Sequence, residues 1–353
     1  MANKLSRNVT YLLGAGASAN AIPVVSQMEA RLIEMSRIIT SIDANNATLK
    51  EIREELRWLA KHHKKYYSID TAAKIFYHKE GRNSESLRRL KKVVSLYFVL
   101  EQISIPDFDL SAYDPGEAIK KGIYYEAIDN RYYRLLAYYL GNNHIPKLPE
   151  NLHFISWNYD FQLELAFHEF GNNTYLRETS EEINSLPRES RHKLNTGDVD
   201  RGKVIHLNGV AGLLTSPLDK RYSTQSLVDQ LHLSRKDLFS KKLQELNILE
   251  KFDCDRTLSF AWEEESMSKD YLAKAAQVML ETDDLVVIGY SFPNFNREVD
   301  SILISNFWRE GLGTKRIFYQ DISDKSQNLE GMFKIKGVQA YTEVGEHFIP
   351  PGV

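Results

Sequence analysis

Five short apolar segments, each ending in small or polar residues, constrain the fold of this chain more than any other feature. The segments are VTYLLGAGAS (9–18), LHFISWNYD (152–160), KVIHLNG (203–209), DLVVIGYS (284–291) and KRIFYQDIS (315–323). Short runs rich in Val, Ile, Leu and aromatic residues are typical of strands buried on both faces of a parallel sheet. We therefore predict an α/β fold, a Rossmann-like and mostly parallel sheet flanked by helices, whose functional residues lie where the strands end.

A long segment with helical periodicity separates the first apolar run from the second. In ATLKEIREELRWLAKHHKKYY (47–67) leucine and isoleucine recur every three or four residues, and two later segments repeat the pattern. We predict an α/β domain made of residues 1–26 and 151–353, interrupted by a helical insertion at 27–150. Residues 171–202 are polar and lack a strand pattern, so we predict a loop or lid there.

Composition excludes several other classes of protein. The chain has 353 residues, of which 42% are hydrophobic and 26% charged, and its net charge of −3 provides no overall basic field. Its single cysteine, Cys254, excludes a disulfide framework and a zinc site built mainly from thiolates. No apolar run reaches the length of a membrane-spanning helix. We expect a cytoplasmic protein with no metal, no membrane association and no direct nucleic-acid binding, and we interpret the basic runs at 61–65 and 88–92 as solvated helix faces.

The first strand leads into a glycine-rich turn, Gly14-Ala15-Gly16-Ala17-Ser18. Glycines allow a close backbone approach to a phosphate, and free N–H groups at the start of a helix would supply hydrogen-bond donors. The motif is not a P-loop, because no Gly-Lys-Ser/Thr follows it. It also lacks the second strand ending in an acid that a dehydrogenase needs for the ribose hydroxyls. A tight strand-to-helix connection without a ligand is the alternative interpretation.

Four motifs in order, GAGAS with a following IP, SWNYD, IHLNG and VVIGYSFP, resemble the sirtuin family. The resemblance is closer to the bacterial sirtuin-like NADases of anti-phage defence systems. It covers residues 9–23 and 152 to about 323, and the helical insertion is not matched. The resemblance implies that the α/β domain is a Rossmann-like NAD-binding domain of the sirtuin type.

The resemblance also implies roles for residues at each strand end. The turn from Gly14 to Ser18 would hold the NAD phosphates, and Asn158 and Asp160 would lie beside the nicotinamide ribose. Cleavage of the nicotinamide–ribose bond passes through an oxocarbenium-like state, for which an amide that orients water and a nearby carboxylate are suited. For both residues the alternative is capping of the following helix. The remaining implied NAD contacts are Gly289, Tyr290 and Ser291, together with Asp321, which is assigned by its position alone.

The general base is harder to assign, because sirtuins place a histidine immediately before a glycine. Here Asn208 precedes Gly209, and His206 comes two residues earlier. If the strand continues to 208, His206 and Asn208 project from the same face. An imidazole suits proton abstraction near neutral pH. We predict His206 as the base and Asn208 as a ribose contact, with a structural histidine as the alternative.

Two absences bear on the reaction that the resemblance implies. One cysteine cannot build the four-cysteine zinc module that deacylating sirtuins carry, and the family's Phe-Arg after the proline is replaced by VV at 24–25. Both favour water as the acceptor. The expected activity is hydrolysis of NAD⁺ to nicotinamide and ADP-ribose by an antiviral effector that depletes NAD in abortive infection. Cyclisation to cyclic ADP-ribose, with the adenine in place of water as the acceptor, stays open.

Control of such an activity implies assembly with other proteins. In similar defence proteins the partners are further copies of the chain, a HerA-like ATPase or, as our second choice, a short Argonaute. The tyrosine-rich segment 122–140 is either a contact surface or a helical core. Three alternative functions stay open: a non-catalytic NAD or ADP-ribose sensor, a structural subunit of a defence complex, and a protein deacylase or ADP-ribosyltransferase.

Overall fold

A seven-stranded, all-parallel sheet forms the centre of the protein. The computed structural model describes residues 7–102, 128–141, 144–187, 203–215, 224–226, 258–263, 266–309 and 314–351. The strands of the sheet are β1 (Val9–Leu13), β2 (Leu152–Ser156), β3 (Ser185–Leu186), β4 (Val204–His206), β7 (Asp284–Ile288), β8 (Arg316–Gln320) and β9 (Val338–Tyr341). Their order is β3-β4-β2-β1-β7-β8-β9. The predicted α/β fold and its five strands are confirmed, and β3 and β9 are additional.

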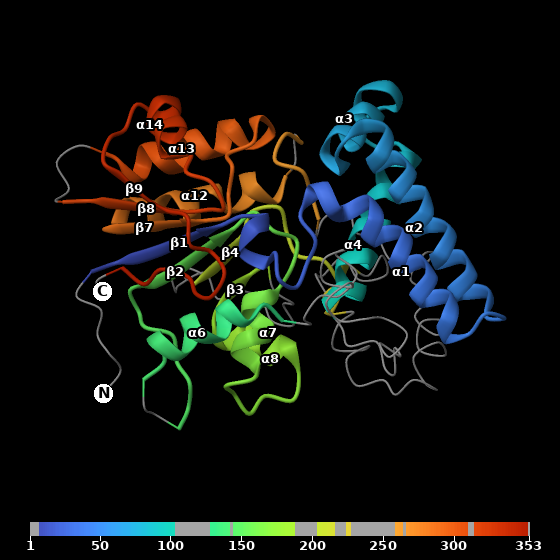
Figure 1. Ribbon diagram of the computed structural model, residues 1–353, viewed down its shortest axis with the longest axis horizontal. Coiled ribbons are helices and arrows are strands. Elements are labelled where there is room, and N and C mark those ends of the chain that lie inside the picture. The colour runs from blue at the N-terminus through green and yellow to red at the C-terminus, as the bar shows by residue number, and fades with distance from the viewer. Residues whose placement is uncertain are drawn as a thin grey trace.

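Helices cover both faces of the sheet, which explains why its central strands β1 and β7 are mostly apolar and fully buried. Figure 1 shows α6 (Asn130–Tyr139), α7 (Gln162–His168) and α8 (Leu176–Glu182) on one face, and α12 (Met267–Glu281), α13 (Arg297–Phe307) and α14 (Ser326–Phe333) on the other. All five residues of β1 and all five of β7 are buried. A short antiparallel pair, β5 (Leu213–Thr215) and β6 (Thr224–Ser226), lies outside this sheet.

The strand order reverses at β1. On one side of β1 lie β2, β4 and, at the edge, β3; on the other side the chain runs outward from β7 through β8 to β9. The paired strands are in register, with Leu13 opposite Ser156 on β2 and Ile288 on β7. Parallel sheets bind ligands at such a switch point, in the crevice beyond the carboxyl ends of the strands. The topology therefore predicts a ligand site formed by the loops after β1, β2 and β7.

Four helices form an arm beside the sheet body (Figure 1): α1 (Met28–Ile42), α2 (Ala47–Tyr66), α3 (Ile69–Glu80) and α4 (Glu85–Gln102). The predicted apolar stripe of α2 is fully buried among the other helices of the arm. Side-chain caps define the helix starts, because Asn46 accepts from Leu49 N and Ser68 accepts from Thr71 N. The helical periodicity of the insertion is thus confirmed over α1 to α4.

The arm is attached to the carboxyl edge of the sheet. Gln102 Oε1 on α4 accepts a hydrogen bond from Phe161 N at 2.8 Å, in the loop after β2. Ser95 Oγ accepts from Gly212 N at 2.9 Å. On α3, the Lys74 ammonium lies 5.2 Å from the ring centre of Phe295, in the segment between β7 and α13. The arm therefore touches the loops that follow two central strands.

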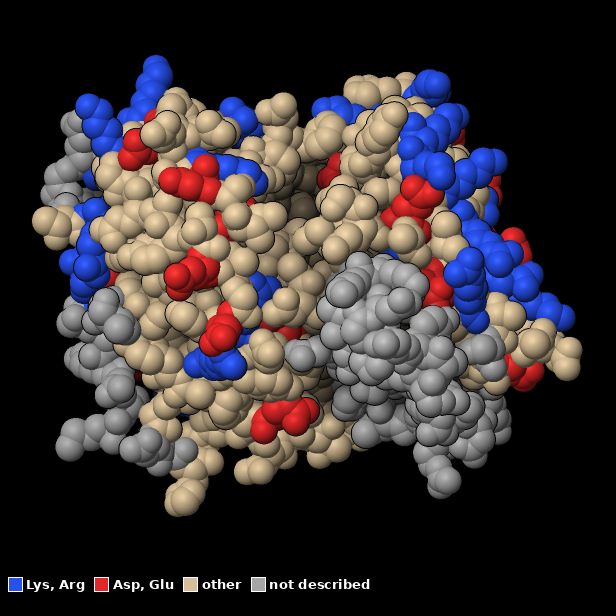
Figure 2. Space-filling model, viewed as in Figure 1, with Lys and Arg blue, Asp and Glu red and all other residues tan. Residues whose placement is uncertain are grey.

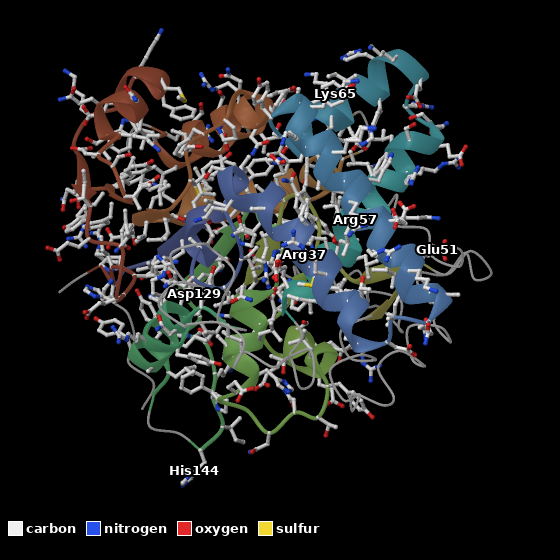
Figure 3. The ribbon with its side chains drawn as sticks, turned by 45° about the vertical axis from the view of Figure 1, so that its right-hand side comes forward. Arg37, Glu51, Arg57, Lys65, Asp129 and His144 are labelled. Atoms are coloured by element: carbon white, nitrogen blue, oxygen red, sulfur yellow. The ribbon has the colours of Figure 1, made fainter. Side chains whose placement is uncertain are left out.

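The charged face of the arm is exposed. Figure 2 shows Lys and Arg side chains gathered on its outer flank, and Figure 3 shows Glu51, Arg57 and Lys65 following one another along α2. Acidic partners accompany several of the basic groups: Lys64 lies 2.9 Å from Glu29. Such exposed pairs contribute little to stability, and they reduce the positive charge of the surface. The prediction of no direct nucleic-acid binding stays a prediction.

Packing departs from the predicted boundary at residue 150. Helix α6 lies within 27–150, yet its Tyr132 and Tyr139 are buried in the core of the sheet body together with Tyr11. These two tyrosines therefore belong to the core between α6 and the sheet, while residues 122–127 of the proposed contact surface lie outside the described residues. The predicted loop at 171–202 is wrong where α8 and β3 form, and residues 188–202 are not described. None of the described helices combines the length and hydropathy needed to cross a bilayer.

Candidate functional site

The glycine turn after β1 packs directly against the end of β7. Gly14 N donates to Ile288 O, and Gly16 N donates to Gly289 O, both at 3.0 Å. A Cβ added to Gly16 would lie 2.6 Å from Gly289 Cα, and one added to Gly289, whose φ is +55°, would lie 2.3 Å from Gly16 Cα. Both glycines are thus required by the close approach of two backbones, whether or not a ligand binds.

This packing changes the predicted role of the turn. The N–H groups of Gly14, Gly16 and Ala17 all donate to backbone carbonyls, so the prediction of free donors is wrong for these three residues. Ala15 is exposed and Gly16 is partly exposed, whereas Ala17 and Ser18 are buried. A bound phosphate would therefore meet the turn at Ala15 and Gly16 rather than along its whole length.

Asn158 joins the loop after β2 to the glycine turn. Its Nδ2 donates to Gly14 O at 2.9 Å and to Ser18 Oγ at 3.4 Å, across 144 residues of sequence in the first case. Its side chain makes no capping contact with α7, so the capping alternative is wrong for Asn158. The two motifs are therefore in direct contact at the switch point of the sheet.

Asp160 lies against the same turn and also contacts the start of α7. Its Oδ1 accepts from Gln162 N at 3.2 Å, which is the helix-start contact expected under the alternative interpretation. Burial raises the pKa of Asp160 to about 6, even though hydrogen bonds from Ser18 and Gln162 and the charge of His206 act to lower it. Both predicted interpretations of Asp160 are therefore compatible with its position.

His206 is held in a buried ion pair with Glu164 of α7. Nε2 of His206 donates to Glu164 Oε1 at 2.8 Å, and Ser185 Oγ donates to the same oxygen at 2.6 Å. The two side chains are only 3% and 2% exposed. Burial alone would lower the pKa of His206, but the Glu164 carboxylate raises it above its ordinary value. Conversely, burial would raise the pKa of Glu164, and His206 and Ser185 hold it below its ordinary value.

His206 and Asn208 do not share a face as predicted. Strand β4 ends at His206, and Leu207 and Asn208 form a turn closed by a hydrogen bond from Gly209 N to His206 O. Asn208 Nδ2 donates to Trp157 O at 3.1 Å, while His206 faces α7. The strand stops two residues too early for the alternation to hold, and Gly209, with φ of +81°, permits the turn.

Three buried polar atoms near this turn have no hydrogen-bond partner: His206 Nδ1, Glu164 Oε2 and Asn208 Oδ1. The backbone of Asn158 is near enough to raise the pKa of His206, yet Nδ1 forms no hydrogen bond of acceptable geometry. Buried polar atoms are nearly always paired, so such a group of exceptions is typical of a site completed by a ligand or by water.

Of the residues predicted after β7 and β8, Gly289 contacts the glycine turn, whereas Asp321 lies apart from it. Tyr290 is buried with its ring stacked on that of Trp157, centres 6.1 Å apart, and Ser291 is exposed. Asp321 accepts a hydrogen bond from Tyr319 Oη at 3.1 Å and lies 3.6 Å from Lys325 Nζ. Since β7 separates β8 from β1, the structure brings Asn158, Asp160 and the glycine turn together and leaves Asp321 apart.

A buried ion pair at the start of α6, Asp129 at the N-cap and Arg131 in the first turn, contacts the glycine turn and is not predicted from the sequence. Arg131 Nη2 donates to Gly16 O at 2.9 Å, and its guanidinium makes two further bonds to Asp129, at 2.9 and 2.6 Å. Asp129, labelled in Figure 3, also accepts from Asn20 N at 3.0 Å. No sequence signal marks these residues, because the contact to Gly16 spans 115 positions.

No protein-family model matches this chain, and a search of curated proteins finds no match either. Within the described ranges, no group of three or more His, Cys, Asp and Glu side chains is arranged to hold a metal ion. The function must therefore be argued from the site itself.

Proposed function

We propose that the protein binds NAD⁺ across the carboxyl edge of its sheet and hydrolyses the nicotinamide–ribose bond, which yields nicotinamide and ADP-ribose. One observation carries the proposal. The hydrogen bonds of Asn158 to Gly14 and Ser18 join two motifs that resemble those of sirtuins, at the point where Rossmann-like sheets bind ligands.

The order of the strands suggests how the dinucleotide lies. Asp321 follows β8, Ser291 follows β7, the glycine turn follows β1, and Asn158 and Asn208 follow β2 and β4. A dinucleotide laid along this edge has its adenosine over β7 and β8 and its pyrophosphate by the glycine turn. Its nicotinamide ribose then lies over β2 and β4. The exposed groups of Ala15 and Ser291 are the ones accessible to the phosphates.

In this pose, Asn158 and Asp160 are the residues that promote cleavage of the nicotinamide–ribose bond. As the C–N bond breaks, nicotinamide leaves with the bonding electron pair, and positive charge develops on the ribose. An ionised Asp160 stabilises that charge and accepts a proton from the water that attacks C1′. A carboxylate whose pKa is about 6 is ionised at neutral pH and still basic enough for this transfer. Asn158 orients the ribose or the water, and Asn208 Oδ1, which has no partner, accepts from a ribose hydroxyl.

We assign His206 a positioning role in this scheme, in place of the predicted base. Its Nε2 is committed to Glu164, and its ring is buried beneath the loop that carries Asn158. The charged pair fixes the end of β4 against α7 and thereby the backbone of the loop after β2. The predicted assignment of His206 as the base stays a prediction, which the variants in the Discussion test.

The biological setting that we propose is antiviral defence in the cytoplasm, with assembly restraining the enzyme. Partners are further copies of the chain, a HerA-like ATPase or a short Argonaute. The arm supports such control, because Gln102 on α4 binds the backbone of Phe161, the residue next to Asp160. A partner that shifts α4 would therefore act on the loop that carries the proposed catalytic residues.

A second candidate function, a non-catalytic sensor of NAD or ADP-ribose, is favoured by one observation. The position that sirtuins give to their base holds Asn208, and the nearby histidine is already paired with Glu164. A deacylase or ADP-ribosyltransferase differs from both, because its nicotinamide release would require an acyl peptide or a protein acceptor.

Nicotinamide release by the full chain distinguishes these functions. The purified protein is incubated with NAD⁺ over a range of protein concentrations, with and without acyl peptide, and NAD⁺ binding is followed by calorimetry. Our proposal expects release without peptide, abolished in Asn158→Ala and kept in the surface control Asn45→Ala. Binding without release would support the sensor, and release only with peptide would support the deacylase.

A further inference from the structure

We propose that Asp300 is a positioning residue that ties the loop after β2 to the loop after β7. The inference rests on the proposed function. Asp300, on α13, is 0% exposed. Its Oδ1 accepts a hydrogen bond from Trp157 Nε1 at 3.1 Å, and its Oδ2 accepts from Tyr290 Oη at 2.8 Å. One carboxylate thus bridges two loops that are far apart in sequence.

Each bonded residue is adjacent to a proposed site residue. Trp157 precedes Asn158, whose amide reaches the glycine turn, and Tyr290 lies between Gly289 and Ser291. The Trp157 and Tyr290 rings stack at an angle of 19°. Asp300 therefore fixes both the amide proposed to act at the ribose and the loop proposed to meet the phosphates.

The hydrogen bonds around the Asp300 carboxylate are matched in direction. Asn296 Nδ2 donates to Tyr290 Oη at 3.0 Å, so the tyrosine hydroxyl accepts from Asn296 and donates to Asp300. Tyr319 Oη, whose single proton is shared between Tyr290 O at 3.2 Å and Asp321 Oδ2 at 3.1 Å, holds the same loop from β8. Two donors facing two oxygens require a group that only accepts, and an ionised carboxylate is that group.

A buried acid at this position is unfavourable unless it has another role. Burial raises the pKa of Asp300 to about 7, although the Tyr290 and Trp157 hydrogen bonds and the charge of Arg297 oppose the rise. Asp70, on α3, faces Tyr290 from the arm and adds negative charge. Apolar replacements of buried charges are often neutral or stabilising, so packing alone does not explain an acid here. A role in positioning the loops after β2 and β7 explains why a buried acid stands at this position.

The two hydrogen bonds of Asp300 can be removed separately. Trp157→Phe removes the indole N–H and keeps an aromatic ring, which should mainly lower kcat, because Asn158 loses its fixed position. Tyr290→Phe removes the hydroxyl and should mainly raise KM for NAD⁺. Asp300→Asn removes one of these hydrogen bonds or both, and we expect kcat/KM to fall by about 10- to 100-fold. The exposed Asp43→Asn is the matched control and should leave kcat/KM unchanged.

The test combines nicotinamide release with the ¹H–¹⁵N signal of the Trp157 indole, which Trp157→Phe assigns. We expect Asp300→Asn to move that signal and to lower kcat/KM while its thermal midpoint stays unchanged or rises. If the wild type cleaves NAD⁺ and Asp300→Asn cleaves it equally fast, the positioning role is overturned and the proposed function stands. If the wild type neither binds nor cleaves NAD⁺, the proposed function fails. The indole signal then decides alone: a moved signal supports the bridge, and an unmoved one overturns it.

Discussion

Asn158 and Gly14 lie 144 residues apart in sequence, and a 2.9 Å hydrogen bond from the Asn158 amide to the Gly14 carbonyl joins them. The bond links the end of β2 to the end of β1, the two strands beside the point where the sheet order reverses. Asp160, His206, Gly289 and Arg131 surround this contact, and changes to them should affect both the fold and NAD⁺ cleavage.

Asp160→Asn should stabilise the protein at pH 7 and abolish NAD⁺ cleavage. The pKa of Asp160 is raised from 3.8 to about 6, so ionisation disfavours the folded state by about 3 kcal/mol at neutral pH. Asparagine keeps an oxygen for Gln162 N without the charge. The folded state binds the proton more tightly, so wild-type stability falls as pH rises from about 4 to about 6. Urea unfolding at several pH values measures this, with Asp43→Asn as the control.

A stability difference between Asp160→Asn and wild type that did not change across this pH range would contradict the buried-acid assignment. Cleavage at the wild-type rate by the same variant would contradict its catalytic role.

His206 and Glu164 should act as a unit. Removing one partner leaves an uncompensated buried charge, so His206→Gln and Glu164→Gln should each cost about 3–5 kcal/mol of stability, and the double variant should cost less than their sum. Because the pKa of His206 is raised in the folded state, its charge contributes stability that is fully present below about pH 6.5. This stability is lost as pH rises through the raised pKa. Because the pKa of Glu164 is lowered in the folded state, its charge contributes stability that is fully present above about pH 4.5. This stability is lost as pH falls through the lowered pKa.

Nicotinamide release separates the base from the positioning role. If His206 only positions the loop, His206→Gln and Glu164→Gln lower the rate by similar factors. A loss confined to His206→Gln would restore the histidine as the base.

Gly289→Ala should destabilise the fold by roughly 3 kcal/mol or more, because its Cβ would lie 2.3 Å from Gly16 Cα. Gly337 provides a matched control. It also has a positive φ, +79°, but an added Cβ there meets no atom within 4 Å. Gly337→Ala should therefore cost only the backbone strain, about 1–2 kcal/mol. Equal midpoints for the two variants in urea would contradict the tight packing of the glycine turn on β7.

Arg131→Lys should weaken NAD⁺ binding and destabilise the fold. A lysine cannot reproduce the bonds of the guanidinium to Asp129, Gly16 O and Val344 O. We expect a loss of about 1–3 kcal/mol, because the charge is kept but buried acceptors of the guanidinium lose their donors. Arg134→Lys is the control, because Arg134 is exposed and forms a 3.6 Å surface pair with Glu346 that should contribute under about 1 kcal/mol. Equal effects of the two variants would rule out support of the turn by Arg131.

The sequence predicts five strands of the sheet because these strands are short, mostly apolar runs that end in small or polar residues. The two-residue β3 is too short to give a pattern, and α6 shows a helical period that does not reveal which core receives Tyr132. Periodicity reports that a face is buried, and the partner of that face is decided by tertiary packing.

The candidate site was predicted in part. Asn158 and Asp160 lie beside the glycine turn, because β1 and β2 are neighbours in one parallel sheet and their carboxyl ends therefore lie side by side. The glycines were ambiguous, because a phosphate and a neighbouring backbone both require the absence of a side chain. The turn after His206 and the contacts of Arg131 and Asp300 depend on partners distant in sequence, which no local pattern encodes.

A crystal structure of Asn158→Ala with NAD⁺ tests the central claim most directly, since this variant should bind the substrate without cleaving it. The account predicts the pyrophosphate against Ala15 and Gly16, with the nicotinamide ribose in contact with Asp160 and Asn208. A dinucleotide bound away from the ends of β1 and β2, or no binding at concentrations that saturate the wild type, would contradict it.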